Sequence, residues 1–242
     1  MIAKIGDRIL TAAASIVVLL MLLYSGYSLW DIWYGSHNIV KSSDLIEYKP
    51  VISEEDDDAI SFEEILKLNE DVCGWITLDG TNIDYPIVQG TDDFEYINKD
   101  VFGNRSLGGA IYLSTQNKKD FSDVYSIIYG HNINGDQMFA DLGKYRENSF
   151  FQTYSSGMLI LPTGKHPLKV IACMNVDAYD RVVYIGPEKI NQESVNTLKA
   201  YIQKNAVNKR ELSDSNSSKI LALSTCADAM SENRIVVFCQ YE

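Results

Sequence analysis

Three side chains suited to covalent catalysis stand at the ends of apolar runs in this sequence. Cys226 ends one run rich in aliphatic residues, and Arg234 opens the next, with seven residues between them. If the two runs pair as an antiparallel hairpin, Cys226 and Arg234 come to the same end of a sheet. His131 ends a third apolar run, and we expect Gly130 to let the backbone turn sharply there. A thiol, an imidazole and a guanidinium would then share one rim.

The chemistry that this trio suits is acyl transfer. A thiolate attacks a carbonyl carbon, an imidazole exchanges protons with the thiol and the leaving amine, and a permanent cation stabilises the oxyanion. The spacing leaves a second interpretation open, because a strand cysteine, a lone histidine and a surface arginine are also common structural residues. Cys173 and Cys239 fit that packing interpretation, with a disulfide between them as an alternative.

The first thirty residues predict a membrane anchor. Residues 9–30 form 22 consecutive positions without a charge, and at about 1.5 Å per residue they cross a hydrocarbon core of about 30 Å. Lys4 and Arg8 precede this segment, so the positive-inside rule predicts a cytoplasmic tail of residues 1–8 and an extracellular remainder. The alternative is a cleaved signal peptide. The small residues 12–15 lie before the apolar run, where a cleavage site is not placed, which favours the uncleaved helix.

The remainder divides into a predicted stalk, residues 31–60, and a folded domain, residues 61–242. The stalk has little periodicity and contains the acidic run Glu54–Asp58, which is typical of a solvated linker. Ser61, followed three residues later by Glu64, predicts a capping box at the start of a short helix.

The domain itself predicts a mainly β fold. Eight runs rich in β-branched and aromatic residues are separated mostly by turn residues, which favours a closed or nearly closed barrel. Two helices interrupt them: Asp136–Tyr145, and Pro187 to about Ala206 between the sixth and seventh strands, with Pro187 in its first turn. The predicted strands are Gly74–Leu78, Ile83–Gln89, Ala110–Leu113, Val124–His131, Met158–Leu161, Leu168–Val176, Ile220–Cys226 and Ile235–Gln240.

Charge and cysteine spacing exclude other classes of function. The net charge is −12, and no basic block is interleaved with aromatic residues, so we expect no nucleic-acid partner. The four cysteines include no C-x-x-C pair and there are only three histidines, so no zinc site of familiar spacing can be written. No calcium-ligand loop is evident either, and we expect neither a metal nor a cofactor.

Short sequence motifs around these residues carry a family resemblance. Leu223-Ser-Thr-Cys226, followed by Arg234 and preceded far upstream by Tyr129-Gly-His-Asn132, resembles the signature of sortases. These are membrane-anchored cysteine transpeptidases of Gram-positive bacteria. The segments 74–89 and 130–139 are similar to the opening strands and the histidine loop of class B sortases. The order His, Cys, Arg is also similar to sortases and unlike papain-type or NlpC/P60 enzymes.

The resemblance implies a fold and a role for individual residues. The fold is an eight-stranded sortase-like β-barrel with an N-terminal helix and a helix between strands six and seven, preceded by a single transmembrane helix. Cys226 matches the family's nucleophile, His131 its general acid/base and Arg234 the residue that stabilises the substrate carbonyl and oxyanion. Ser224 and Asp228, two residues before and after the nucleophile, are candidate substrate-binding residues.

The function that the resemblance implies is cell-wall anchoring at the cell membrane, with the catalytic domain outside. Such enzymes cleave a C-terminal sorting motif of a secreted protein after its Thr, hold the acyl chain as a Cys thioester and transfer it to an amine of a peptidoglycan precursor. Two alternatives stay open: a pilus-polymerising sortase that uses a pilin Lys, and a non-enzymatic membrane-tethered β-barrel binding module. Leu161–Gly164 looks like part of a sorting signal, but we expect a turn between strands there. His37 and His166 are assigned no role.

Overall fold

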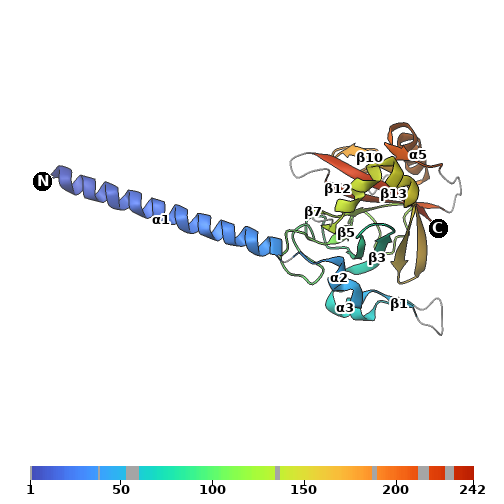
Figure 1. The fold of residues 1–242 in the computed structure, drawn as a ribbon, viewed down its shortest axis with the longest axis horizontal. Coiled ribbons are helices and arrows are strands. Elements are labelled where there is room, and N and C mark those ends of the chain that lie inside the picture. Colours follow the sequence, from blue (N-terminus) through green and yellow to red (C-terminus); the bar gives the residue numbers. More distant parts are fainter. Residues whose placement is uncertain are drawn as a thin grey trace.

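The strands close on themselves into a barrel, and a long helix extends away from it (Figure 1). The computed structural model describes residues 2–37, 39–52, 60–133, 137–186, 190–211, 218–226 and 232–242. The barrel strands are β3 (Val72–Leu78), β4 (Asp84–Val88), β5 (Ile111–Leu113), β6 (Tyr125–Tyr129), β9 (Ser156–Leu161), β10 (Gly164–Asp177), β12 (Lys219–Cys226) and β13 (Asn233–Tyr241). Each overlaps one of the eight predicted strands, so the predicted fold class is confirmed.

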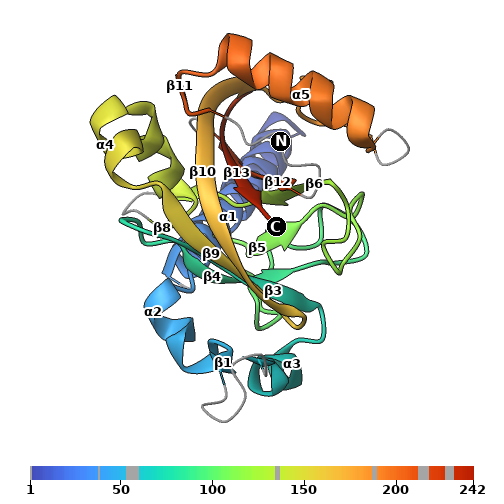
Figure 2. The same ribbon diagram turned by 90° about the vertical axis from the view of Figure 1, so that its right-hand side faces the viewer.

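The closure comes from one strand that pairs on both sides. Within the described residues the sheet has nine strands in the order β11-β10-β13-β12-β6-β5-β4-β3-β9, and β10 also pairs with β9. The two-residue β11 (Asn208–Lys209) lies outside that closed ring, which leaves eight strands around the barrel. Figure 2 shows β10 running between β13 and β9. The pairs β4–β5 and β6–β12 are parallel and the other barrel pairs are antiparallel.

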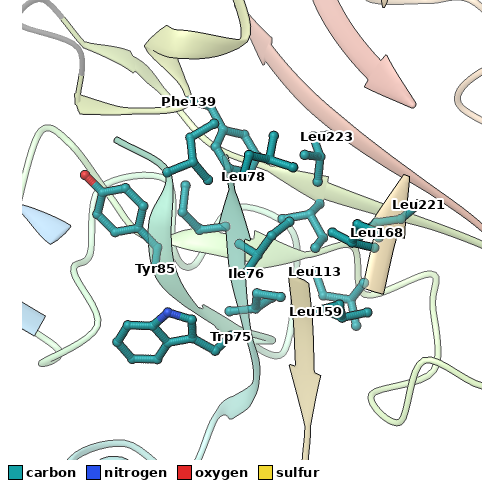
Figure 3. Packing of buried hydrophobic residues seen from close by; sticks show 14 of the residues in the cluster. Trp75, Ile76, Leu78, Tyr85, Leu113, Phe139, Leu159, Leu168, Leu221 and Leu223 are labelled. Carbon is teal, nitrogen blue, oxygen red and sulfur yellow. The ribbon is translucent and has the colours of Figure 1, made fainter. Parts of the chain in front are cut away.

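Strand β12 contains an uninterrupted apolar run because both of its faces are buried. Leu221 and Leu223 belong to the hydrophobic cluster inside the barrel, whereas Ile220 and Ala222 belong to a second cluster under helix α5 (Gln192–Asn205). Successive strand residues point to opposite faces, so a strand buried on both faces must be apolar throughout. Figure 3 shows the inner cluster, in which side chains from β3, β4, β5, β9, β10 and β12 meet.

Helix α5 is in the predicted place but starts later than predicted. It lies between β10 and β12 in the chain, across the outside of the barrel (Figure 2), and buries Val195, Leu198 and Ile202. Its N-cap is Asn191, whose side chain accepts a hydrogen bond from the Ser194 N–H at 3.0 Å. That cap begins the helix at Gln192, so the prediction that the helix starts at Pro187 is wrong; Pro187 itself is outside the described residues.

The helix predicted over Asp136–Tyr145 is shorter and differently wound. Its first residue is outside the described part of the chain, and Gln137–Met138 form strand β8, which pairs with β7 (Asn132–Ile133). The 3₁₀-helix η2 (Ala140–Arg146) follows and leads into α4 (Asn148–Thr153). Residues 137 and 138 were predicted to be helical, but they form a strand because they pair with β7.

The predicted capping box at Ser61 is also wrong. Ser61 belongs to β2 (Ile60–Ser61), which pairs with β1 (Val51–Ile52), and helix α3 (Glu63–Leu68) has Phe62 as its N-cap. The Ser61 hydroxyl accepts a long hydrogen bond from the Glu63 N–H at 3.4 Å. The helix therefore begins one residue later than a Ser61 cap would require.

The chain between the long helix and β1 packs on the barrel. Residues 39–50 were expected to belong to an extended stalk, but they include α2 (Ser42–Leu45) and the 3₁₀-helix η1 (Ile46–Tyr48). Leu45 is buried in the inner cluster, and Lys49 forms an ion pair with Asp84 of β4 at 2.8 Å. Apolar burial thus holds this part of the predicted linker to the barrel. The acidic run Glu54–Asp58 is outside the described residues.

Helix α1 (Ile2–His37) is the candidate membrane anchor. The segment Lys4–Gly35 is long and apolar enough to cross a membrane, and none of its most apolar stretch is buried against the protein. The C-terminal end of α1 contacts the domain: Asp31 forms an ion pair with Arg105, and Gly35 is buried beside Leu107.

Two smaller predictions can be compared directly with the structure. Leu161 and Gly164 are the first pair of the β9–β10 hairpin, so the motif that resembles a sorting signal is the turn between two strands, as expected. Cys173 and Cys239 are free, buried thiols, so the alternative of a disulfide between them is wrong.

Candidate active site

The β12–β13 ladder puts two of the predicted site residues opposite each other. Cys226 is the last residue of β12, and its direct register partner on β13 is Arg234. Directly opposite residues of an antiparallel pair belong to the same face of the sheet. The structure describes the backbone of Cys226 but not its side chain, and Asp228 is outside the described residues.

Strand β6 brings the histidine to the same end of the barrel. It pairs in parallel with β12, with Tyr129 opposite Ser224, and the Gly130 N–H donates to the Ser224 carbonyl at 3.1 Å. His131 comes two residues after Tyr129, and Cys226 comes two residues after Ser224. Because the two strands are parallel, both residues lie just beyond the last pair of this ladder, at the same end of the barrel.

Gly130 has a different role from the expected one. Its φ is not positive, so the chain does not depend on glycine for an unusual turn at this position. A Cβ at Gly130 would instead lie 2.5 Å from Ile111 Cδ1 and 2.7 Å from Phe139 Cγ. The physical reason for glycine is the close approach of these two side chains to the backbone immediately before His131.

The His131 ring is half-buried and held by a backbone oxygen. Its Nε2 lies 2.8 Å from the carbonyl oxygen of Ile97, in the loop between β4 and β5. A carbonyl can only accept a hydrogen bond, so Nε2 must carry the proton. In the neutral ring Nδ1 is then the nitrogen that can accept a proton. The main chain of His131 is fixed as well, because its carbonyl accepts from the Phe139 N–H at 2.9 Å.

A groove of about 520 Å³ runs over this end of the barrel. His131 and Arg234 both line it, so the structure brings these two predicted residues to one cavity. Residues from β5, β6, β12 and three loops complete its walls. The lining residues are Phe94, Ile97, Tyr112, Tyr129, Gly130, His131, Ala178, Tyr179, Tyr184, Ser224, Thr225 and Arg234.

One wall of the groove is aromatic. The Tyr129 ring lies between Tyr112 and Tyr184, with ring centroids 5.3 Å and 6.4 Å apart. Burial raises the pKa of Tyr129 well above its ordinary value, so this hydroxyl stays neutral. Ser224 is buried in the same wall, and its hydroxyl is 2.9 Å from that of Tyr184. The predicted substrate-binding residue Ser224 therefore already has a protein partner.

Several groove residues carried no signal in the sequence. Ile97 acts through its carbonyl, which every residue type has, so its side chain could not reveal the contact. Phe94 and Tyr179 stand on the two loops that flank the groove, and their side chains are 79% and 74% exposed. Large exposed aromatic side chains beside a groove suit contact with a peptide. Only their position in the folded chain distinguishes them from other aromatic residues.

The remaining thiols are unsuited to nucleophilic chemistry. Cys73, Cys173 and Cys239 are buried, and burial raises the pKa of each thiol to about 12. A thiol with such a pKa stays protonated at neutral pH. In the part of the chain that the structure describes, no group of three or more His, Cys, Asp or Glu residues is placed to hold a metal ion.

Comparison with known proteins identifies relatives of this chain. Residues 76–242 match the model of the Sortase domain family. The chain is 30% identical to Sortase B of Staphylococcus aureus over 178 residues, which are 73% of this chain and 72% of that protein.

Solved structures show the same similarity in three dimensions. A Streptococcus pyogenes class B sortase involved in pilus biogenesis matches with a TM-score of 0.67 and 38% identity, over 75% of this chain and 98% of that one. The Staphylococcus aureus sortase B–substrate complex matches with a TM-score of 0.68 and 29% identity, over 75% of this chain and 84% of that one.

Proposed function

Since this chain belongs to the sortase family of cysteine transpeptidases, we propose that Cys226 is its nucleophile, His131 its general acid/base and Arg234 its oxyanion-stabilising residue. One observation carries this assignment: His131 and Arg234 line a single groove at the end of the strand that Cys226 terminates. Membership in a family of enzymes also removes the alternative of a non-enzymatic binding module.

The first half-reaction forms the thioester. The Cys226 thiolate attacks the carbonyl carbon of the scissile peptide bond, and the electron pair of the C=O moves onto oxygen. The Arg234 guanidinium stabilises that oxyanion. When the tetrahedral adduct collapses, the C–N bond breaks and the leaving amine takes a proton from the His131 imidazolium.

The second half-reaction reverses the proton flow. An incoming amine attacks the thioester carbonyl and gives up a proton to neutral His131, while the C–S bond breaks and the Cys226 thiolate leaves. Because Nε2–H donates to the Ile97 carbonyl, Nδ1 is the ring nitrogen that gains and loses this proton. The same histidine nitrogen thus serves as acid in one step and as base in the other.

The substrates follow from the family. We propose that the groove binds a C-terminal sorting motif of a secreted protein, that the enzyme cleaves after the Thr of that motif, and that a peptidoglycan-precursor amine resolves the thioester. The groove is aromatic on one wall and open at the surface, which suits a peptide. Similarity to a sortase B solved with its substrate supports the same assignment.

The direct test is a peptide library. The purified chain is incubated with peptides that vary around a central Thr, with and without an added amine, and the products are identified by mass spectrometry. We expect an acyl product that ends in Thr and, with the amine present, a new amide at that Thr. The same library with Cys226→Ala is the matched control. Cleavage that this variant retains would overturn the assignment of the nucleophile.

A second candidate function is pilus polymerisation. It is favoured by one finding, the 38% identity to a class B sortase involved in pilus biogenesis, which this chain matches over 98% of that protein. The two candidates share the thioester and differ in the amine that resolves it. Competition between a peptidoglycan stem-peptide amine and a Lys-containing pilin peptide for the preformed thioester distinguishes them by the mass of the product.

We also propose a membrane topology. Residues 1–8 would form a cytoplasmic tail, residues 9–30 the spanning part of α1, and residues 61–242 the extracellular catalytic domain. Single cysteines introduced at Ile5 and Ser122 in a Cys226→Ala background test it on intact cells. A membrane-impermeant maleimide should label Ser122→Cys and should label Ile5→Cys only after the cells are opened. Labelling of Ile5→Cys on intact cells would show that the N-terminus is outside the cell and that the proposed orientation is wrong.

A further inference from the structure

The orientation of His131 depends on a loop rather than on a strand. The Ile97 carbonyl that accepts from Nε2–H belongs to the connection between β4 and β5, which spans residues 89–110. Connecting loops are generally the most mobile parts of a domain, so a loop that orients a reacting group must itself be fixed. The residue immediately before Ile97 supplies that attachment.

Tyr96 is fastened to the barrel at both its side chain and its backbone. It is only 1% exposed, and its hydroxyl donates to Asp71 Oδ2 at 2.6 Å and accepts from Asn69 Nδ2 at 2.9 Å. Burial and the neighbouring Asp71 raise the pKa of Tyr96 to about 12, so the hydroxyl keeps the proton that it donates. The Tyr96 carbonyl accepts from the Ala110 N–H at 3.0 Å, which ties Tyr96 to the last residue of the loop.

The returning end of the loop packs against the same two peptide groups. Gly109 has φ +58°, and a Cβ there would lie 2.5 Å from both the Tyr96 and the Ile97 carbonyl oxygens. Asn69 Nδ2 also donates to the Val101 carbonyl at 2.9 Å. The Ile97 carbonyl is therefore confined by backbone on one side and by the His131 ring on the other, while the Tyr96 side chain anchors the residue that precedes Ile97.

We propose that Tyr96 is a positioning residue for the transpeptidation. Through the carbonyl of Ile97, it holds the His131 ring with Nε2–H bonded and Nδ1 turned to the reaction. This inference rests on the proposed role of His131 as the acid/base. Tyr96 does not line the groove, so it touches no substrate and acts only through its neighbour.

Loss of the Tyr96 hydroxyl has a specific consequence. It leaves the Asp71 carboxylate and the Asn69 amide without this partner. The loop around Ile97 is then held less tightly, so the Ile97 carbonyl can move. Both half-reactions need a correctly placed imidazole, and misplacement of a catalytic group by about 1 Å can lower a rate by about 100-fold. For a loosened acceptor we expect kcat to fall about tenfold. KM for the sorting peptide should change much less, because Ile97 is the groove residue next to Tyr96 and most of the groove lies on other elements.

The experiment compares Tyr96→Phe with the unaltered full-length chain in detergent micelles. The first readout is kcat and KM for the best peptide of the library. The second is the ring ¹⁵N spectrum of His131, which reports how much of the neutral ring carries its proton on Nε2. We expect a lower kcat, a much smaller change in KM and a smaller Nε2–H population. Tyr241→Phe is the matched control, because Tyr241 is also buried and its hydroxyl donates to Phe121 at the opposite end of β13 from Arg234.

A second pair of variants keeps the test decisive if Tyr96→Phe folds poorly. Asp71→Asn retains an acceptor oxygen and should keep kcat near that of the unaltered chain, whereas Asp71→Ala should lower kcat as Tyr96→Phe does. Because Tyr96 and Asp71 act through one contact, Tyr96→Phe combined with Asp71→Ala should be no slower than either alone.

The result that overturns the inference is specific to it. If Tyr96→Phe and Asp71→Ala keep the kcat of the unaltered chain, or lose activity only in proportion to unfolded protein with the His131 spectrum unchanged, Tyr96 has a purely structural role. The proposed function fails separately, by undiminished activity of His131→Ala. A chain that depends on His131 but not on Tyr96 would refute only the positioning role.

Discussion

Arg234 is the direct antiparallel partner of Cys226, one on each strand of the β12–β13 hairpin. The cation is thus placed by a ladder of backbone hydrogen bonds, and eight residue pairs define that register. Opposite positions in such a ladder have Cβ atoms about 4.5–5.5 Å apart. If Cys226 is the nucleophile, as we propose, a guanidinium on the directly opposite residue would be fixed near the oxyanion before the reaction begins. Such preorganisation is the condition for effective electrostatic stabilisation.

Replacement of the three proposed catalytic residues should have graded effects. Cys226→Ala should abolish cleavage, because alanine offers no nucleophile in place of the thiolate. His131→Ala should lower kcat about 10²–10⁴-fold through loss of proton transfer, and Arg234→Ala about 10²–10³-fold through loss of oxyanion stabilisation. Arg234→Lys keeps the charge without the planar fork and should be intermediate. Peptide cleavage followed by mass spectrometry measures each rate. The exposed Arg146→Ala on η2 is the control, and equal rates for Arg234→Ala and Arg146→Ala would contradict the role of Arg234.

Thiol labelling should distinguish Cys226 from the other cysteines. The pKa values of Cys73, Cys173 and Cys239 are raised to about 12 by burial, so at pH 8 these thiols stay protonated as well as inaccessible. We expect iodoacetamide to modify the native chain once, at Cys226, and the denatured chain four times. Peptide mapping identifies the modified sites. Native labelling at any of the three buried cysteines, or none at Cys226, would show that the assignment of thiol reactivity is wrong.

A methyl group at Gly130 should disturb the histidine without touching it. The added Cβ would lie 2.5 Å from Ile111 Cδ1 and 2.7 Å from Phe139 Cγ, so Gly130→Ala must push these side chains or its own backbone aside. Overpacking of this kind costs about 1–3 kcal/mol of stability. We expect a lower Tm and a reduced kcat, because the shift begins next to His131.

Gly186→Ala is the control for that substitution, since a Cβ at Gly186 would meet nothing within 4 Å. It should leave Tm and kcat close to those of the unaltered chain. If Gly130→Ala also left Tm and kcat unchanged, the close packing before His131 would contribute to neither stability nor activity.

The ion pair between Asp31 and Arg105 should fix the end of α1 on the barrel. Arg105 bonds both carboxylate oxygens of Asp31, and the Leu107 N–H donates to the Gly35 carbonyl at 3.5 Å. Exposed ion pairs contribute about 0.2–1 kcal/mol, so Arg105→Glu should speed amide exchange in residues 103–109 about two- to fivefold. Hydrogen exchange of the full-length chain in nanodiscs measures this. The double variant Asp31→Arg with Arg105→Glu should restore slow exchange, and failure to restore it would mean that the pair does not hold the junction.

Local sequence signals identified the strands well and their boundaries with the helices less well. Hydrophobic runs and turn residues act over a few positions, so all eight barrel strands could be predicted from them. The capping box at Ser61 and the helix start at Pro187 failed because several neighbouring residues can cap a helix. Ser61 is paired in β2, which leaves Phe62 as the N-cap of α3, and the Asn191 side chain caps α5 through the Ser194 N–H. Part of the predicted stalk packs on the barrel because Leu45 is buried in the core and Val40 and Tyr48 pack against it.

The amino-acid sequence by itself determined the apolar N-terminal helix, the β12–β13 hairpin and the residue types available for acyl transfer, since each depends on neighbours in the chain. Only the tertiary structure decided which His131 nitrogen carries its proton and what holds the ring. The acceptor is a main-chain carbonyl 34 residues away, and its loop is fixed by Tyr96, Asp71 and Asn69. A main-chain carbonyl is the same in every residue, so its use as a partner becomes visible only when distant segments are brought together in space.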